Sequence, residues 1–224
     1  LSYEIIIVDD HSTDKTYSIS KKLSKIYSVQ YFQKKGTSGK GYSILEGADN
    51  AQSDIICMID ADLQYNPKHI PEMYNKLVKN DTVGVVIAER KIYKTSLMRK
   101  LGSKMNALFI GKLLMNLPYD IQSGLKIFRK DVIMHVSEDL IGPWSLDIPL
   151  LKTAKELGYT IATVPIIFDD RDGGVSKISF LRTAHEISTN ALKMKFKHNR
   201  RVFHVPAHNA RSMKGAGVIK KKKK

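Results

Sequence analysis

The chain alternates short apolar runs with longer amphipathic segments over most of its length. Strand-forming runs at 4–8, 29–32, 53–59, 83–88 and 160–168 are each followed by a polar or glycine-containing stretch. This alternation of strands and helices predicts an α/β domain with a mainly parallel sheet flanked by helices. One helix is predicted from the capping residues at 12–14 to about residue 27. A second passes through residues 45 and 48, and a third starts at residue 67. Three more cover residues 95–117, 146–157 and 178–196.

Acidic and amide side chains follow two of these predicted strands. Asp9 and Asp10 come after the first run, and the segment Asp60-Ala61-Asp62-Leu63-Gln64 comes after the third. In open α/β sheets ligands bind beyond the carboxyl ends of the strands, so both segments are predicted to border a binding site. Acids at strand ends also serve as helix caps, and this second interpretation stays open for Asp9 and Asp10.

The segment after the third strand has the composition of a site for a hard cation. Asp60 and Asp62 flank one small residue, and an extended backbone would point both carboxylates the same way. The amide oxygen of Gln64 would be a third ligand, and such oxygen donors suit Mg²⁺ or Mn²⁺. A metal there would neutralise charge on a departing nucleoside diphosphate. The alternative, capping of the helix near Pro67, leaves two carboxylates unexplained, so we favour the metal site.

A loop rich in Gly, Ser and Lys covers residues 34–41. Its backbone N–H groups and the Lys40 ammonium would suit a phosphate group. The glycine spacing fits no P-loop, however, and a plain surface loop explains the segment equally well.

Composition and charge narrow the class of protein. A length of 224 residues with 42% hydrophobic content suffices for one core and one domain. The net charge of +15 is concentrated after residue 186, where 12 of the 37 Lys and Arg lie without any acid. That tail has no nucleic-acid-binding motif or aromatic platform, so a nucleic-acid partner is not expected. The single Cys57 lies in an apolar run, which predicts a core position and a reducing, cytosol-facing compartment.

The end of the chain bears on membrane association. No window reaches the roughly 18 to 20 apolar residues of a membrane span, and there is no signal peptide. We expect a catalytic domain at 1–177, an amphipathic helix at 178–197 and a flexible basic tail at 198–224. Such a helix and tail suit an anionic membrane surface, because each basic residue near the surface contributes about 1 kcal/mol to the binding free energy. A core-packed helix with a solvated tail fits the pattern equally well.

The motifs occur in an order that resembles a known family. Residues Val8 to Thr16, Asp60 to Gln64, Asp120 to Arg129, Trp144 to Asp147 and Arg171 to Lys177 resemble the nucleotide-sugar half of family 2 glycosyltransferases, which have the Rossmann-like GT-A fold. The similarity is to the subgroup that makes polyprenyl-phosphate sugars, typified by dolichol-phosphate mannose synthase. The family's first strand, which brings a Pro, an aromatic residue and an acid to the nucleotide pocket, is missing because the sequence starts after its place.

The resemblance implies an inverting, metal-dependent transfer of a hexose from a GDP-mannose or UDP-glucose type of donor to a polyprenyl or dolichyl phosphate, on the cytosolic face of a membrane. A saccharide hydroxyl is the alternative acceptor and would need a general base, and a catalytically inactive scaffold is a further alternative if the first strand is absent. The implied contacts to the nucleotide-sugar, together with Lys40 of the loop described above, are Val8, Asp10, Asp60, Ala61, Asp62 and Gln64, of which Asp60, Asp62 and Gln64 are the implied metal ligands. The implied contacts to the acceptor phosphate are Arg171, Ser176 and Lys177. The implied catalytic residues are Asp62, Arg90, Asp120 and Arg171.

Some of these residues also have plainer interpretations. Arg90 would equally suit a solvated charge at a strand end. Asp120 and Asp147 would serve as bases or orienting groups, but we favour a structural role for both, as partners of neighbouring cations.

Overall fold

The computed structural model describes residues 2–93, 117–168, 186, 188–190 and 193. The predicted helix at 95–117 therefore lies outside the described residues except for its last position, and so do Arg171, Ser176 and Lys177. Most of the predicted helix at 178–197 and all of the tail at 198–224 lie outside as well.

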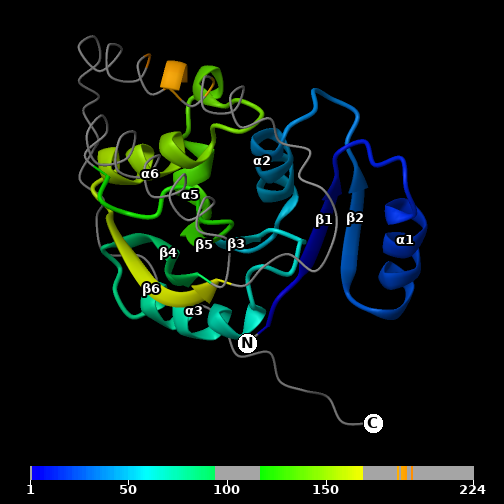
Figure 1. The fold of residues 1–224 in the computed structure, drawn as a ribbon, viewed down its shortest axis with the longest axis horizontal. Coiled ribbons are helices and arrows are strands. Elements are labelled where there is room, and N and C mark those ends of the chain that lie inside the picture. The colour runs from blue at the N-terminus through cyan, green and yellow to red at the C-terminus, as the bar shows by residue number, and fades with distance from the viewer. Residues whose placement is uncertain (1, 94–116, 169–185, 187, 191–192, 194–224) are drawn as a thin grey trace.

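Strands and helices alternate along the described chain, which confirms the predicted α/β class (Figure 1). The strand β5 and the short helix α5 follow the predicted motif at Asp120 and were not predicted as such. The strands are β1 (Ile5–Asp9), β2 (Val29–Gln33), β3 (Ile55–Ile59), β4 (Val83–Tyr93), β5 (Leu125–Arg129) and β6 (Thr160–Phe168). The helices are α1 (Thr16–Ile26), α2 (Lys40–Asn50), α3 (Ile70–Val78), α5 (Lys130–Met134) and α6 (Asp147–Glu156), with single 3₁₀ turns at Pro67–His69 and Glu138–Leu140.

The strands of the described residues form two sheets. β1 and β2 form a parallel pair, and the other four strands lie in the order β3-β5-β4-β6. β4 and β6 are parallel, whereas β5 runs antiparallel to both of its neighbours. β5 is therefore a central strand that is hydrogen-bonded along both edges.

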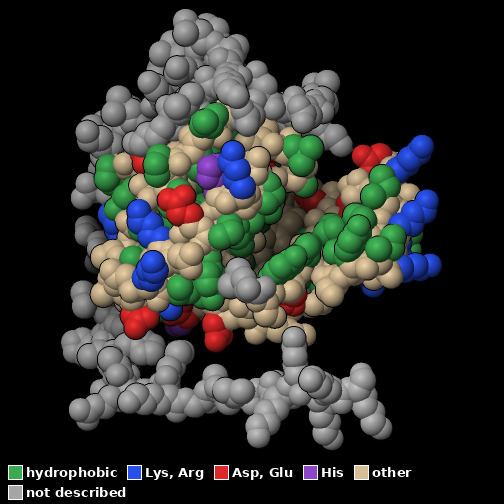
Figure 2. Space-filling view, turned by 90° about the horizontal axis from the view of Figure 1, so that it is seen from below, with side chains coloured by type: hydrophobic (Ala, Val, Ile, Leu, Met, Phe, Trp, Pro, Cys, Tyr) green, Lys and Arg blue, Asp and Glu red, His purple; other side chains and the backbone are tan. Residues whose placement is uncertain are grey.

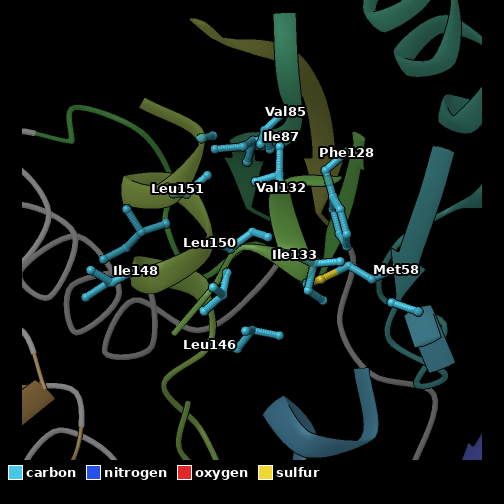
Figure 3. Packing of buried hydrophobic residues seen from close by; sticks show 14 of the residues in the cluster. Met58, Val85, Ile87, Phe128, Val132, Ile133, Leu146, Ile148, Leu150 and Leu151 are labelled. Carbon is cyan, nitrogen blue, oxygen red and sulfur yellow. The ribbon is translucent and has the colours of Figure 1, made fainter. Parts of the chain in front are cut away.

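The four-stranded sheet is buried on both faces. Along β4, Val85 and Ile87 belong to one core cluster, while Val86 and Ala88 belong to the other. Successive strand residues point to opposite faces, so this alternation places one cluster on each side of the sheet. The cluster in Figure 3 contains Val132 and Ile133 of α5 and Leu150 and Leu151 of α6. The opposite cluster contains Met73 and Leu77 of α3.

β3 is less buried than its neighbour β5. Only Met58 is buried in it, and Cys57 and Ile59 are exposed. The predicted core position of Cys57 is therefore wrong. β3 pairs with β5 along one edge only, and a cleft of about 480 Å³ opens between β1 and β3, lined by Ile6 of β1 and Cys57 among others. Figure 2 shows the hollow beside the unit that α1, β1 and β2 form.

The two-sided burial predicts a large stability loss for a core truncation. Leu150 of α6 has no exposed surface, so Leu150→Ala is expected to lower the free energy of unfolding by about 2 to 5 kcal/mol, through lost burial and the cavity left behind. Urea denaturation followed by circular dichroism measures this change. Ile26→Ala is the control, because Ile26 is 70% exposed and its truncation is expected to cost less than about 0.5 kcal/mol.

Candidate nucleotide-sugar and metal site

The acidic segment lies at the carboxyl end of β3, where the chain turns. β3 ends at Ile59, a turn covers Ala61 and Asp62, and Leu63 has a φ of 61°. The extended path expected through these residues is therefore wrong, because the chain has to reverse before the helical turn at Pro67. Asp60, Ala61 and Asp62 nevertheless stand at the predicted edge of the sheet.

Asp60 is held from two directions. Its backbone N–H donates to the carbonyl of Gly124 over 3.0 Å. Its carboxylate lies against Gly124 so closely that a Cβ on that residue would collide with it. The absence of a side chain at Gly124 therefore lets the turn before β5 pack directly against the Asp60 carboxylate.

Lys40, the first residue of α2, faces this acidic cluster. Its Nζ lies 2.6 Å from Oδ1 of Asp60. Burial by itself would lower the pKa of Lys40, but the carboxylates of Asp60, Asp147 and Asp62 together raise it above its ordinary value. Lys40 is therefore an ammonium at neutral pH, and it brings α2 to the end of β3.

The residues at the end of β3 fit a hard divalent cation. Asp60 already binds a cationic group, the Lys40 ammonium, with one carboxylate oxygen. Asp62 accepts a hydrogen bond from the Gln64 backbone at 3.3 Å, and the Gln64 side chain is buried. Among the residues described, no three His, Cys, Asp or Glu side chains converge on one point, so a metal would rely on two carboxylates and the Gln64 amide. Such oxygen donors suit Mg²⁺ or Mn²⁺, which keep positions for water and phosphate.

The Asp10 carboxylate binds the loop at residues 34–41. It accepts hydrogen bonds from the Ser38 hydroxyl at 2.9 Å and from the Gly39 N–H at 2.8 Å, and the buried Lys34 ammonium lies 3.4 Å away. Burial acts to raise the pKa of Asp10, but the bonds from Gly39, Ser38 and His11 and the charge of Lys34 lower it overall. The loop is therefore held by one carboxylate just before Lys40, while residues 35–38 are exposed, so phosphate binding by this loop stays a prediction.

One cleft collects several of the predicted nucleotide-sugar contacts. Val8 from β1, Lys40 from α2, and Asp60 and Ala61 from the end of β3 all line the cleft between the two sheets. These residues come from three separate parts of the sequence, and the ends of β1 and β3 bring them together.

Arg90 and Asp120 pair with one another. The Arg90 Nε donates to Asp120 Oδ2 at 2.5 Å and its Nη2 donates to Oδ1 at 2.6 Å, so the pair is bidentate. Both side chains are 11% exposed, and the guanidinium lies over the ring of Phe168. The solvated interpretation of Arg90 is wrong, because the side chain is largely covered. The structural interpretation of Asp120 agrees with this geometry, and the catalytic roles of both residues stay predictions.

The described residues after 185 contact the body of the protein near α2. The backbone N–H of Trp144 donates to Oε1 of Glu186 at 2.9 Å, and the Asn190 amide donates to the Ser145 hydroxyl at 2.5 Å. The same loop accepts a bond from the Gly41 N–H at the carbonyl of Pro143, over 3.0 Å. Sequence reasoning did not anticipate Glu186, because no spacing relates it to the loop.

Sequence reasoning also missed Lys126. It lies within the apolar run of β5, is fully buried, and donates to Asp147 Oδ1 at 2.6 Å. A single charge inside a strand of apolar residues was the available signal. The expectation that Asp147 pairs with a neighbouring cation agrees with this contact.

The fold is that of the GT-A glycosyltransferases. The chain belongs to glycosyl transferase family 2, whose family model matches residues 1–137. Membership of this family agrees with the order of motifs along the sequence.

Three curated relatives are similar over most of the chain. Dolichol-phosphate mannosyltransferase of Pyrococcus furiosus is 29% identical over 185 residues, which are 80% of this chain and 51% of the relative. Dolichyl-phosphate beta-glucosyltransferase of Dictyostelium discoideum is 26% identical, over 88% of this chain and 64% of the relative. Dodecaprenyl-phosphate galacturonate synthase of Rhizobium johnstonii is 29% identical, covering 81% and 54%. The chain thus spans about half to two thirds of the length of these relatives.

Solved structures support the fold. Glucosyl-3-phosphoglycerate synthase from Mycobacterium tuberculosis, in a complex with Mn²⁺, UDP-glucose and phosphoglyceric acid, matches with a TM-score of 0.65 at 17% identity, over 85% of this chain and 68% of that one. Mannosyl-3-phosphoglycerate synthase from Rubrobacter xylanophilus matches with a TM-score of 0.67 at 13% identity, over 93% and 68%. At these identities the similarity concerns the fold alone.

None of the helices among the described residues combines the length and the apolar character that a membrane span requires.

The contacts of Asp10 predict a pH dependence of stability. The folded-state pKa of Asp10 is lowered, so its stabilising contribution is complete above the unfolded-state pKa of about 3.9 and is lost as the pH falls through the folded value. Asp10→Asn is expected to lower the free energy of unfolding by about 1 kcal/mol at pH 7 and by less below pH 4. Urea unfolding between pH 3 and 7 tests this. Asp54→Asn, at an exposed position, is the control, and an equal loss at every pH would contradict the assignment.

Proposed function

We propose that the chain transfers a hexose from a nucleotide-sugar donor to a polyprenyl phosphate, with inversion and with a divalent metal. The observation that carries this proposal is that Val8, Lys40, Asp60 and Ala61 line one cleft. Each of the three curated relatives is named for a dolichyl- or dodecaprenyl-phosphate product or acceptor, which supports the lipid phosphate as acceptor.

The donor lies in the cleft between β1 and β3. Val8 borders the nucleoside, with Asp10 holding the loop beside it. Asp60, Asp62 and Gln64 hold Mg²⁺ or Mn²⁺, which when bound offsets the charge on the leaving diphosphate. The Lys40 ammonium, already beside Asp60, adds a second positive charge at the same place. A GDP-mannose or UDP-glucose type of donor fits this arrangement.

The acceptor supplies its own nucleophile. A phosphate monoester is an anion at neutral pH, since its second pKa is about 6, and it needs no general base. One of its oxygens attacks the anomeric carbon, the bond to the nucleoside diphosphate breaks, and the diphosphate leaves with the electron pair. Arg171, Ser176 and Lys177 bind and orient the acceptor phosphate, and Arg90 and Asp120 take part in catalysis as an ion pair.

The lipid acceptor places the protein at a membrane surface. The 12 basic residues after 186, with no acid among them, favour an anionic leaflet, and the lone Cys57 favours the cytosolic side. The protein would lie there as a peripheral protein, through the helix at 178–197 and the tail at 198–224.

A donor and acceptor screen tests the transfer. With Mn²⁺ or Mg²⁺ and a short polyprenyl phosphate, the protein is expected to release nucleoside diphosphate from one of the two donor types and to lose this activity in EDTA. Asp62→Ala is expected to lower kcat at least 100-fold, because one metal ligand is lost. Asp81→Ala, at an exposed residue before β4, is the control and is expected to keep full activity.

Two outcomes of the screen would contradict the proposal. Turnover with sugar acceptors but none with lipid phosphate would identify a saccharide hydroxyl as the acceptor. Unchanged turnover in Asp62→Ala would remove the metal assignment.

The basic tail gives a prediction of its own. Deletion of residues 198–224 is expected to weaken binding to vesicles that contain phosphatidylserine at least tenfold at 0.15 M salt, because several favourable charges are removed. Vesicle sedimentation measures this, and neutral phosphatidylcholine vesicles are the control. Equal binding by the full-length and truncated chains would exclude the tail as the anchor.

A further inference from the structure

Lys126 is a charged residue in the middle of the protein core. It lies on the central strand β5 between Met58 of β3 and Ile87 of β4, and none of its surface is exposed. An ammonium at such a position is costly unless every proton has a partner, so its contacts show what the charge is there to hold.

The Lys126 ammonium joins two separate walls of the site. Its Nζ donates to the carbonyl of Ser123 at 2.5 Å and to Oδ1 of Asp147 at 2.6 Å. Ser123 belongs to the turn before β5, and Asp147 is the first residue of α6. Burial lowers the pKa of Lys126, and the charge of Asp147 opposes this.

Both contacts lead to the ion pair between Lys40 and Asp60. The Ser123 carbonyl adjoins Gly124, which accepts the Asp60 N–H and lies against the Asp60 carboxylate. On the other side, Leu146, which precedes Asp147, packs against Gly41, which follows Lys40, since a Cβ at Gly41 would lie 3.3 Å from the Leu146 Cβ. Lys126 thus supports Asp60 through the turn and Lys40 through Asp147.

We propose that Lys126 is a positioning residue for the metal and diphosphate site, acting through Asp147 and the Ser123–Gly124 turn. The identity of the bound groups rests on the function proposed above, and the geometry rests on the contacts of Lys126. An apolar side chain of the same length would fill the space but would leave Asp147 and the turn free to move, because dispersion contacts have no direction and hydrogen bonds do.

Lys126→Met tests this role by removing the ammonium while keeping the length of the side chain. Asp147 is left without its partner, and the melting temperature is expected to fall by roughly 6 to 12 °C. Mn²⁺-dependent binding of the nucleoside diphosphate, measured by calorimetry at 25 °C, is expected to weaken at least tenfold, and kcat is expected to fall by a similar factor.

The double variant Lys126→Met/Asp147→Asn separates positioning from stability. It removes both charges together, so its melting temperature is expected to return to within about 3 °C of the wild type. Its nucleotide binding and kcat are expected to stay at least tenfold low. Asp147→Asn alone is expected to show the same loss of nucleotide binding and kcat. All three variants break the same contact between Lys126 and Asp147, so their effects do not multiply.

Lys130→Met is the control, at the first residue of α5, directly after the same strand. Lys130 follows the far end of β5, and its ammonium donates to the carbonyl of Ala51 at 2.7 Å. This variant is expected to lose stability and to keep wild-type nucleotide binding and kcat.

The results distinguish this inference from the proposed function. A double variant with wild-type melting temperature, binding and kcat would overturn the positioning role, as would effects of the two single variants that multiply. The wild-type protein could bind nucleoside diphosphate with Mn²⁺ and yet transfer nothing to polyprenyl phosphate. That result would overturn the assignment of the acceptor and leave the positioning role supported by the binding measurements.

Discussion

β5 runs through the middle of the sheet, bonded along both edges and covered on both faces, while the turn before it supports an acidic site. Its backbone pairs with β3 and β4, and Leu125 and Ile127 fill the core on the α3 side. The alternate position, Lys126, faces the side of the sheet where Asp147 begins α6. The whole arrangement of the site depends on this strand, because Gly124 fixes Asp60 and Lys126 fixes Asp147.

Three carboxylates among the described residues each lie beside a cation. Asp60 pairs with Lys40, Asp147 pairs with Lys126, and Asp120 pairs with Arg90. Each cation favours the ionised form of its carboxylate partner, because opposite charges at these distances attract one another. In the proposed reaction, a metal would add positive charge and a diphosphate would add negative charge beside the Asp60–Lys40 pair.

Segments that lie far apart in the sequence converge on the first turn of α2. Asp10 at the end of β1 holds Ser38 and Gly39, which lead into Lys40. The Pro143 carbonyl accepts the Gly41 N–H, and the Pro143 loop is held in turn by Glu186. The position of Lys40 therefore depends on both sheets and on the end of the described chain.

The sequence by itself determined the order of strands and helices and the acidic segment at Asp60 to Gln64. These features follow from local patterns, since apolar runs set the strands and polar residues mark their ends. It also placed Asp120 and Asp147 as partners of cations without identifying which cations. The antiparallel direction of β5, the exposure of Cys57 in an open cleft and the turn at Asp62 were decided only by the tertiary structure. Pairing direction and open edges depend on which strands become neighbours, and the burial of Lys126 depends on α6 supplying Asp147. Those contacts join residues more than 20 positions apart, and no local periodicity records them.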